Sequence, residues 1–142
     1  YLPDFNDPDA GYRVAAQFIS QKADVLFCPA GRTGLGGLRA AGESDVKDIG
    51  VDVDQYYTVP DAGRVLITSV MKKVDVAAGV VVTRFARGTL EAGLQAFDLK
   101  SHAVGLAPYH EWEDRIPGTC TDLVARANKK IIIDPDITLQ AP

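Results

Sequence analysis

IGVDVDQ, residues 49–55, is the stretch that decides the fold we expect for this chain. Its short apolar beginning is typical of a buried β-strand, and it ends in two closely spaced carboxylates, Asp52 and Asp54. Such a strand would bring both acidic side chains to the carboxyl end of a parallel sheet, which is where open α/β folds bind their ligands. The stretch therefore predicts a ligand site at this edge of a sheet.

A second polar group follows the next apolar stretch. Residues 68–75 (TSVMKKVD) place Lys72 where another strand is expected to end. A carboxylate and a lysine on neighbouring strand ends suit a polyhydroxylated ligand such as a sugar, because both make charge-assisted hydrogen bonds. Neither stretch pairs a nucleophile with a base, so we predict a binding protein with no catalytic residues.

Helices and strands are expected to alternate around these two stretches. Asp7 and Pro8 form a helix start, with Asp7 as the N-cap and Pro8 as the first helical residue. Residues 23–28 form a short apolar run that indicates a buried strand. The other expected elements are a glycine-rich turn (31–37), helices (35–41, 71–87, 117–130), strands (46–53, 65–68, 94–99, 103–107) and an extended tail (131–139). This order predicts an α/β fold with a parallel sheet flanked by helices, whose first strand ends near Tyr1.

Composition limits the function classes. The chain has 142 residues, a net charge of −4 and scattered basic residues, which argues against nucleic acid as a partner. Its two cysteines and two histidines are not closely spaced, so we predict no metal and no cofactor. Cys28 ends an apolar run and is expected to be a small buried hydrophobe, while a disulfide with Cys120 stays open. No apolar run approaches the ~20 residues of a membrane helix.

The glycine-rich stretch 29–37 (PAGRTGLGG) has two interpretations. It follows a predicted strand and precedes a predicted helix, and a helix N-terminus favours a negatively charged ligand. However, it matches neither the dinucleotide fingerprint nor the P-loop. The alternative is a tight turn that allows a close approach between helix and strand.

Phe5 also has two interpretations. It lies between the end of the expected first strand and the helix that begins at Pro8. In the first interpretation it is a hydrophobic staple that packs on the first helical turn. In the second, its ring stacks on a flat base, an interaction that contributes ~1–3 kcal/mol.

Together these stretches resemble the BMP family, the basic membrane lipoprotein or purine-nucleoside receptor group of ABC-transporter substrate-binding proteins. The matching segments, in family order, are 5–8 (FNDP), 23–27 (ADVLF), 30–34 (AGRTG), 49–55, 68–75 and 104–106 (VGL). The resemblance implies a type I periplasmic-binding-protein fold, with two α/β lobes and the ligand between them. Residues 1–88 would form a Rossmann-like ligand-binding lobe, and residues 89–142 would supply crossover strands and a C-terminal helix that complete the partner lobe.

The resemblance also implies roles for individual residues. Phe5 would stack on the base of a nucleoside, Gly31 would contact the ligand through its backbone with Ala30 beside it, and Asp52 and Lys72 would hold the ribose hydroxyls. Asp54 is a further, more distant candidate.

The implied protein is extracytoplasmic, lipid-anchored or periplasmic, and delivers its nucleoside to an ABC-transporter permease. Its anchor would lie outside this chain. The match corresponds to the later part of family members, so we expect a fragment, or a second chain or homodimer that completes the missing lobe. Two rival hypotheses remain: an α/β enzyme that uses nucleotides or sugar phosphates, and a regulatory half-domain that binds no ligand.

Overall fold

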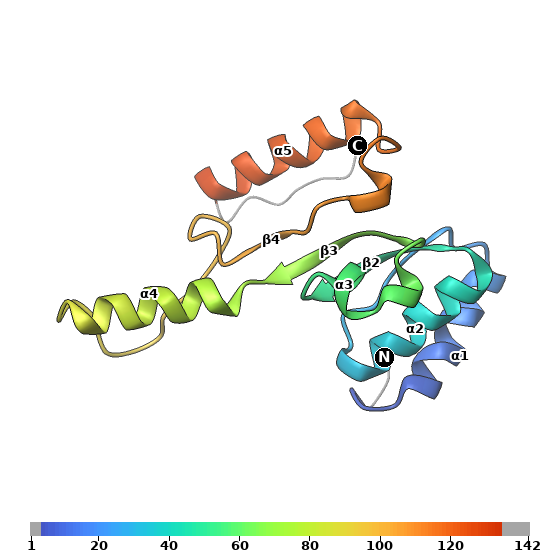
Figure 1. Ribbon diagram of the computed structural model, residues 1–142, viewed down its shortest axis with the longest axis horizontal. Coiled ribbons are helices and arrows are strands. Elements are labelled where there is room, and N and C mark those ends of the chain that lie inside the picture. Colours follow the sequence, from blue (N-terminus) through green and yellow to red (C-terminus); the bar gives the residue numbers. More distant parts are fainter. Residues whose placement is uncertain (1–3, 135–142) are drawn as a thin grey trace. The chain divides into compact units, whose positions relative to one another are not determined.

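The computed structural model describes residues 4–134 (Figure 1). The expected strand end near Tyr1 and the part of the expected tail beyond Asp134 lie outside these residues. The described elements are α1 (Pro8–Ser20), β1 (Val25–Phe27), α2 (Gly31–Ser44), β2 (Lys47–Asp52), α3 (Gln55–Thr58), η1 (Pro60–Ala62), β3 (Leu66–Lys72), α4 (Val74–Ala86), β4 (Val104–Leu106), η2 (His110–Trp112) and α5 (Gly118–Ile133).

The chain divides into two compact units. The first unit comprises the residues up to Met71 together with Leu106–Glu113. The second comprises Lys72–Gly105 and the residues from Asp114 onward.

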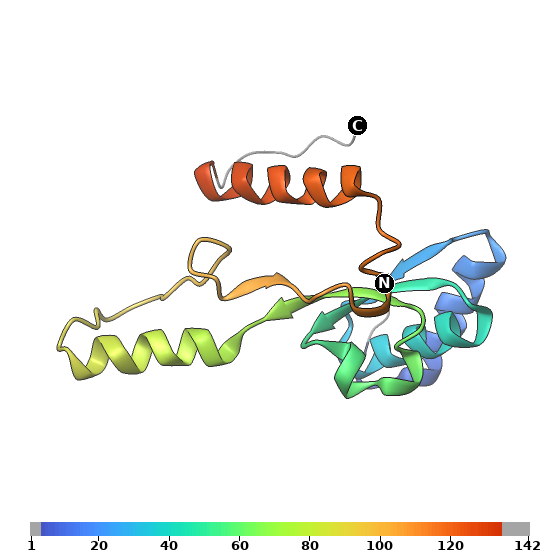
Figure 2. The same ribbon diagram turned by 45° about the horizontal axis from the view of Figure 1, so that its top comes forward.

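The sheet has the order β1-β2-β3-β4 (Figures 1 and 2). Strands β1, β2 and β3 are parallel, with Leu26 opposite Asp48 and Asp52 opposite Met71. Strand β4 is antiparallel to β3. Its flanking residues show this, because Ala107 N–H donates to Ser69 O at 2.9 Å and Lys73 N–H donates to Ala103 O at 2.7 Å. The predicted α/β fold with a mainly parallel sheet flanked by helices is confirmed.

Helices α1 and α2 lie side by side in the first unit, and α2 packs on β1 and β2 (Figures 1 and 2). Asp7 caps α1 as predicted, since its carboxylate accepts from Ala10 N–H at 2.9 Å. The two helices approach closely at Gly36, where any Cβ would collide with the carbonyl oxygen of Pro8. The core beneath them consists of Ala15, Leu26, Leu38, Ala40, Ala41, Ala62, Val65 and Leu66.

Within the first unit, three predictions need correction. The glycine-rich stretch 31–37 is not a turn but the first half of α2, because its glycines let this helix pack tightly on its neighbours. Strand β1 is not fully buried: it is an edge strand of the described sheet, and Val25 and Phe27 are about half exposed. Strand β3 continues beyond the predicted residue 68, because its pairing with β2 extends through Met71.

Three more corrections concern the second unit. Residues 94–99 form no strand. They lie between Gly93, whose φ is +115°, and a turn in which Asp98 and Ser101 exchange side-chain hydrogen bonds. Helix α4 begins at Val74 rather than at residue 71, because β3 continues to Lys72. The segment from residue 131 is still helical through Ile133, where α5 ends.

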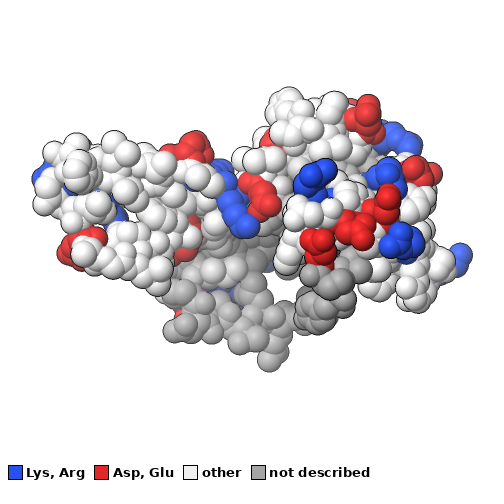
Figure 3. All heavy atoms as spheres, turned by 90° about the horizontal axis from the view of Figure 1, so that it is seen from below, with Lys and Arg blue, Asp and Glu red and all other residues white. Residues whose placement is uncertain are grey.

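Charges are mixed on the surface. In Figure 3, acidic and basic side chains alternate on the face of the first unit that is in view. The first unit carries two exposed ion pairs, Arg39–Asp9 at 3.3 Å and Arg64–Asp45 at 3.4 Å. No helix among residues 4–134 combines the length and apolar character needed to cross a bilayer.

Candidate functional site

A tight turn at the carboxyl end of β2 carries Asp52. Val53 N–H donates to the carbonyl oxygen of Val51 at 2.8 Å, which closes a three-residue turn around Asp52. Asp52 has φ +68° and is exposed. A non-glycine residue persists in this strained conformation only where its surroundings fix the backbone. The turn therefore holds the Asp52 carboxylate at a defined place on the sheet edge. We call residues 51–55 the Asp52 loop.

Hydrogen bonds to Gln55 close the Asp52 loop. The Gln55 Oε1 atom accepts from Val51 N–H at 3.0 Å, and Gln55 N–H donates to Ser69 Oγ at 3.1 Å. Ser69 lies on β3 and is 1% exposed. Gly50 is required here, because a Cβ at this position would collide with Ser69 Oγ. These contacts join residues 49–55 to Ser69 on β3.

The Asp54 carboxylate is mostly buried and contacts other residues of the first unit. Its Oδ1 atom accepts from Tyr56 N–H at 3.3 Å and caps α3. Its Oδ2 atom lies 2.8 Å from His110 Nε2. The exposed side-chain fraction is 16% for Asp54 and 13% for His110. The two carboxylates of the stretch therefore differ in burial: Asp52 is exposed, whereas Asp54 is mostly buried beside His110.

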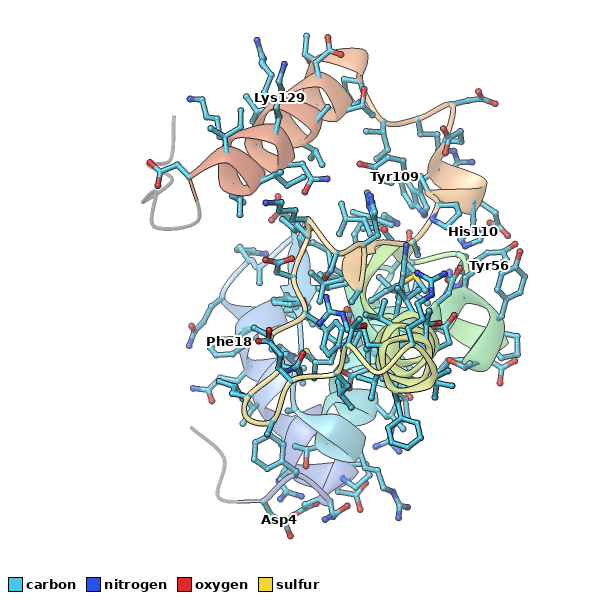
Figure 4. All side chains as sticks on the ribbon, turned by 90° about the vertical axis from the view of Figure 1, so that its left-hand side faces the viewer. Asp4, Phe18, Tyr56, Tyr109, His110 and Lys129 are labelled. Atoms are coloured by element: carbon cyan, nitrogen blue, oxygen red, sulfur yellow. The ribbon has the colours of Figure 1, made fainter. Side chains whose placement is uncertain are left out.

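His110 is the centre of a cluster that sequence reasoning missed. Its ring stacks on Tyr56 at 4.1 Å between centroids, and Tyr57 meets its edge at 5.2 Å. Figure 4 shows Tyr56 and His110 next to each other. The Tyr56 hydroxyl donates to Glu111 Oε1 at 3.2 Å, and this hydrogen bond raises the pKa of Tyr56. We call Asp54, Tyr56, Tyr57, His110 and Glu111 the His110 cluster.

Further contacts fix the segment that carries His110. Thr68 Oγ1 donates to the carbonyl oxygen of Ala107 at 2.8 Å, and Ala107 N–H donates to Ser69 O at 2.9 Å. The Lys47 ammonium lies 4.9 Å from the centre of the Trp112 ring. Residues 106–113 are thus attached to β2, β3 and α3 along their length.

The structure brings Phe5, Ala30 and Gly31 together through Thr33. Thr33 N–H donates to the carbonyl oxygen of Phe5 at 3.0 Å, and its hydroxyl donates to Asp4 O at 2.8 Å. Ala30 is the N-cap of α2, and Gly31, with φ +56°, starts the helix beside Phe5. The hydrogen bond from Thr33 holds the backbone of Phe5 in place. Phe5 is nevertheless 65% exposed, which does not fit a packed hydrophobic staple.

An apolar groove of about 540 Å³ lies beside Phe5 in the first unit. Phe18, labelled in Figure 4, and Phe27 also line it, together with Cys28 and Ala30. Burial raises the pKa of the Cys28 thiol to about 11, so this thiol is neutral at ordinary pH. Cys28 is half-buried against the core, in part as predicted, and both Cys28 and Cys120 are free thiols.

Asp48 is a buried carboxyl on β2, two residues before Gly50. It is 2% exposed, and its Oδ2 atom has no hydrogen-bond partner among the described residues. Burial raises its pKa to about 7. Asp48 therefore contributes an ionisable group to the core of the first unit, on the strand that carries Asp52.

Lys72 is the last residue of β3, and it is exposed. It directly follows Met71, which is the register partner of Asp52. Lys72 belongs to the second unit, whereas the other candidates belong to the first. Among residues 4–134, no group of three His, Cys, Asp or Glu side chains is placed to hold a metal ion.

Comparison with known proteins shows which family this chain resembles in sequence. The family model described as "ABC transporter substrate-binding protein PnrA-like" (Bmp) matches residues 1–137. The "CD4+ T-cell-stimulating antigen" of Listeria monocytogenes is 34% identical over 96% of this chain and 41% of its own length. "Basic membrane protein A" of Borreliella burgdorferi is 32% identical over 94% of this chain and 40% of its own length. The chain thus spans about two fifths of these relatives.

Solved structures share the fold. A solute-binding protein of an ABC transporter system from Aeropyrum pernix superposes with a TM-score of 0.78, at 24% identity, over 98% of this chain and 46% of that one. A protein from Bacillus halodurans, described as a transcriptional activator of the comK gene, has a TM-score of 0.84 at 22% identity, over 98% of this chain and 47% of that one. With the family match and the two relatives, the conclusion is that this chain belongs to the Bmp (PnrA-like) family of ABC transporter substrate-binding proteins.

Proposed function

We propose that this chain is part of an extracytoplasmic substrate-binding protein that captures a nucleoside for an ABC-type importer and performs no chemistry on it. Family membership supports substrate binding in general. The nucleoside rests on one observation, an aromatic ring that is 65% exposed although its backbone is held firmly against the N-terminus of α2. An exposed, fixed ring of this kind suits stacking on a flat base.

Apolar area near Phe5 favours the same ligand class. The groove of about 540 Å³ has a size typical of small-molecule sites, and phenyl and alkyl groups dominate its lining. A purine ring has two faces, so one can stack on Phe5 while the remainder contacts this apolar surface. Gly31, next to Phe5, lets the backbone approach the ligand closely because it carries no side chain.

The carboxylate of Asp52 is the second element of the proposal. A nucleoside carries vicinal ribose hydroxyls, and a carboxylate held on a fixed turn accepts hydrogen bonds from both. Lys72, the last residue of β3, stays the predicted second contact of the ribose. In this proposal Asp54 acts indirectly, because its two oxygens already accept from Tyr56 and His110.

Isothermal calorimetry with adenosine and guanosine tests the assignment of Asp52. We expect Asp52→Ala to weaken binding by more than about 1.5 kcal/mol, because a charge-assisted hydrogen bond is lost. Asp61→Ala, which removes an exposed carboxylate of η1, is the matched control and should bind like the wild type. Unchanged affinity of the Asp52 variant would contradict the proposed ribose contact.

A ligand panel tests the ligand class itself. Thermal unfolding with nucleosides, 2′-deoxynucleosides, free bases and sugars should show the largest stabilisation for ribonucleosides, since a site built for hydroxyls rejects analogues that lack them. Saturation at 100 times Kd adds about 2.7 kcal/mol of stability. Stabilisation by sugars alone, or by no member of the panel, would exclude nucleoside capture. Turnover of a nucleoside would instead support an enzyme.

A further inference from the structure

We propose that Gln55 is a positioning residue that fixes the Asp52 carboxylate for ligand binding, through the hydrogen bond between its side chain and the backbone of Val51. The effect on affinity rests on the proposed function. The link between Gln55 and the Asp52 loop does not, because it rests on contacts within the first unit.

Strand β2 extends beyond the end of its neighbour β1. The pairing of β1 with β2 ends at Ile49, whereas the pairing of β2 with β3 continues to Asp52. Beyond Ile49 the described sheet therefore gives β2 a neighbour on one side only. A backbone N–H on the open side needs an acceptor from elsewhere, since unpaired N–H groups are rare in folded chains. For Val51 that acceptor is the Oε1 atom of Gln55, at 3.0 Å.

Both polar backbone groups of Val51 are hydrogen-bonded within the Asp52 loop. Its N–H donates to Gln55 Oε1, and its carbonyl oxygen accepts from Val53 N–H at 2.8 Å. Asp52 is the middle residue of the turn that the second bond closes, and its φ is +68°. A non-glycine residue keeps this conformation only where neighbouring contacts determine it. The Gln55 side chain therefore fixes the residue from which the strained turn starts.

Gln55 is itself anchored through its backbone. Its N–H donates to Ser69 Oγ at 3.1 Å, and its carbonyl oxygen accepts from Val59 N–H at 2.8 Å. Ser69 is 1% exposed, and Gln55 is the first residue of α3. The Gln55 side chain thus reaches back to Val51 from a backbone that is held on both sides.

Gly50 leaves the space that this side chain occupies. A Cβ at Gly50 would lie 2.8 Å from Gln55 Oε1 and would also collide with Ser69 Oγ. The Gln55 amide oxygen therefore lies directly against the backbone of β2, just before Asp52. The same short stretch of sequence supplies the carboxylate and the group that supports it.

The surroundings of Gln55 favour this indirect role over a direct contact with the ligand. Its Oε1 atom already accepts from Val51 N–H, and the residue is half-buried. Asp52, in contrast, is exposed. Gln55 is thus placed to hold the turn, and Asp52 to meet the ligand.

Three variants separate this role from a general loss of structure. Gln55→Leu keeps a side chain of similar size and removes the acceptor. Gln55→Glu keeps an oxygen that can accept from Val51 N–H. Gln17→Leu is the matched control, because Gln17 is an exposed glutamine of α1.

Hydrogen exchange without ligand tests the link by itself. In Gln55→Leu the Val51 amide should exchange about fivefold faster, the factor expected for one lost hydrogen bond. Gln55→Glu and Gln17→Leu should keep the wild-type rate at Val51. The Asp48 amide, which donates to Val65 O at 2.9 Å, should stay protected in all three variants if they are folded. An unchanged rate at Val51 in Gln55→Leu, or an equal increase in Gln55→Glu, would overturn the proposal.

Calorimetry with guanosine tests the consequence for binding. We expect Gln55→Leu to bind about fivefold more weakly than the wild type, and Gln17→Leu to bind like the wild type. In an Asp52→Ala background, Gln55→Leu should weaken binding by less than about twofold, because the carboxylate that it positions is absent. The same fivefold loss in both backgrounds would overturn the proposal, as would unchanged affinity in Gln55→Leu alone.

These outcomes are distinguishable from failure of the proposed function. If the wild type binds neither guanosine nor adenosine, the proposed function fails, and the effect of Gln55 on affinity fails with it. The exchange rate at Val51 then still decides whether Gln55 fixes the Asp52 loop.

Discussion

Helices α2 and α4 have nearly the same length and opposite surroundings. Helix α2 has 14 residues, including five glycines and several polar side chains, and seven of its residues are buried. Helix α4 has 13 residues, most of them apolar, and none is buried. Val74, Val82 and Phe85 on α4 are 65–75% exposed. Helix α2 is buried because it packs against α1 and the sheet. The hydrophobicity of a helix therefore does not decide its burial here.

The difference extends to the two units. Ten apolar residues are buried in the described part of the chain, and only Ala103 among them belongs to the second unit. A helix in water gains most of its stability from packing of its apolar face. We therefore expect the first unit to contribute most of the stability of this chain, with α4 and α5 contributing little.

The largest expected effect tests this contrast directly. Leu38→Ala on α2 should lower the free energy of unfolding by about 3 kcal/mol, because Leu38 is 3% exposed and truncation leaves a cavity. Phe85→Ala on α4 removes a larger side chain but should cost less than about 0.5 kcal/mol, since Phe85 is 75% exposed. Urea denaturation measures both values. A similar cost at Phe85 would break the comparison and would mean that α4 is packed in solution.

The second largest expected effect is a pH dependence of stability that comes from Asp48, a carboxyl buried in the first unit. Burial raises its pKa in the folded state to about 7, above the ordinary aspartate value of 3.8, so the folded state binds the proton more tightly than the unfolded state. Stability should therefore fall as the pH rises through this window, by about 1.5 kcal/mol between pH 5.5 and pH 7. Asp48→Asn should flatten this dependence, while Asp45→Asn, at an exposed position, should leave it in place. An unchanged slope in Asp48→Asn would exclude Asp48 as its source.

Local sequence patterns predicted much of the fold. Asp7 and Pro8 mark the start of α1 because capping chemistry depends on residues adjacent in sequence. The strand within IGVDVDQ was predicted for the same reason, since a short apolar run before polar residues needs no distant information. The position of Asp52 at the carboxyl end of β2 could be predicted from the end of that strand.

Features that depend on distant partners were not predicted. The glycines of α2 suggested a turn because their helical role depends on α1, and Pro8 is far from Gly36 in the sequence. His110 has no signal of its own, since Asp54 lies 56 residues earlier. The pair Tyr56-Tyr57, which follows Gln55, was a local hint of an aromatic cluster. Long-range pairing decides these positions, and a single sequence does not contain it.

The smallest expected effect concerns how the Asp52 loop is held to the sheet. Ser69→Ala removes the hydroxyl that accepts from Gln55 N–H, and should lower stability by about 1 kcal/mol because this amide loses its partner. Ser20→Ala removes a hydroxyl at the exposed end of α1 and should cost less. Hydrogen exchange should then speed up at Val53 and Gln55 in Ser69→Ala, while α4 stays unchanged. Faster exchange in α4 as well would show that the two regions unfold together, against the contrast drawn above.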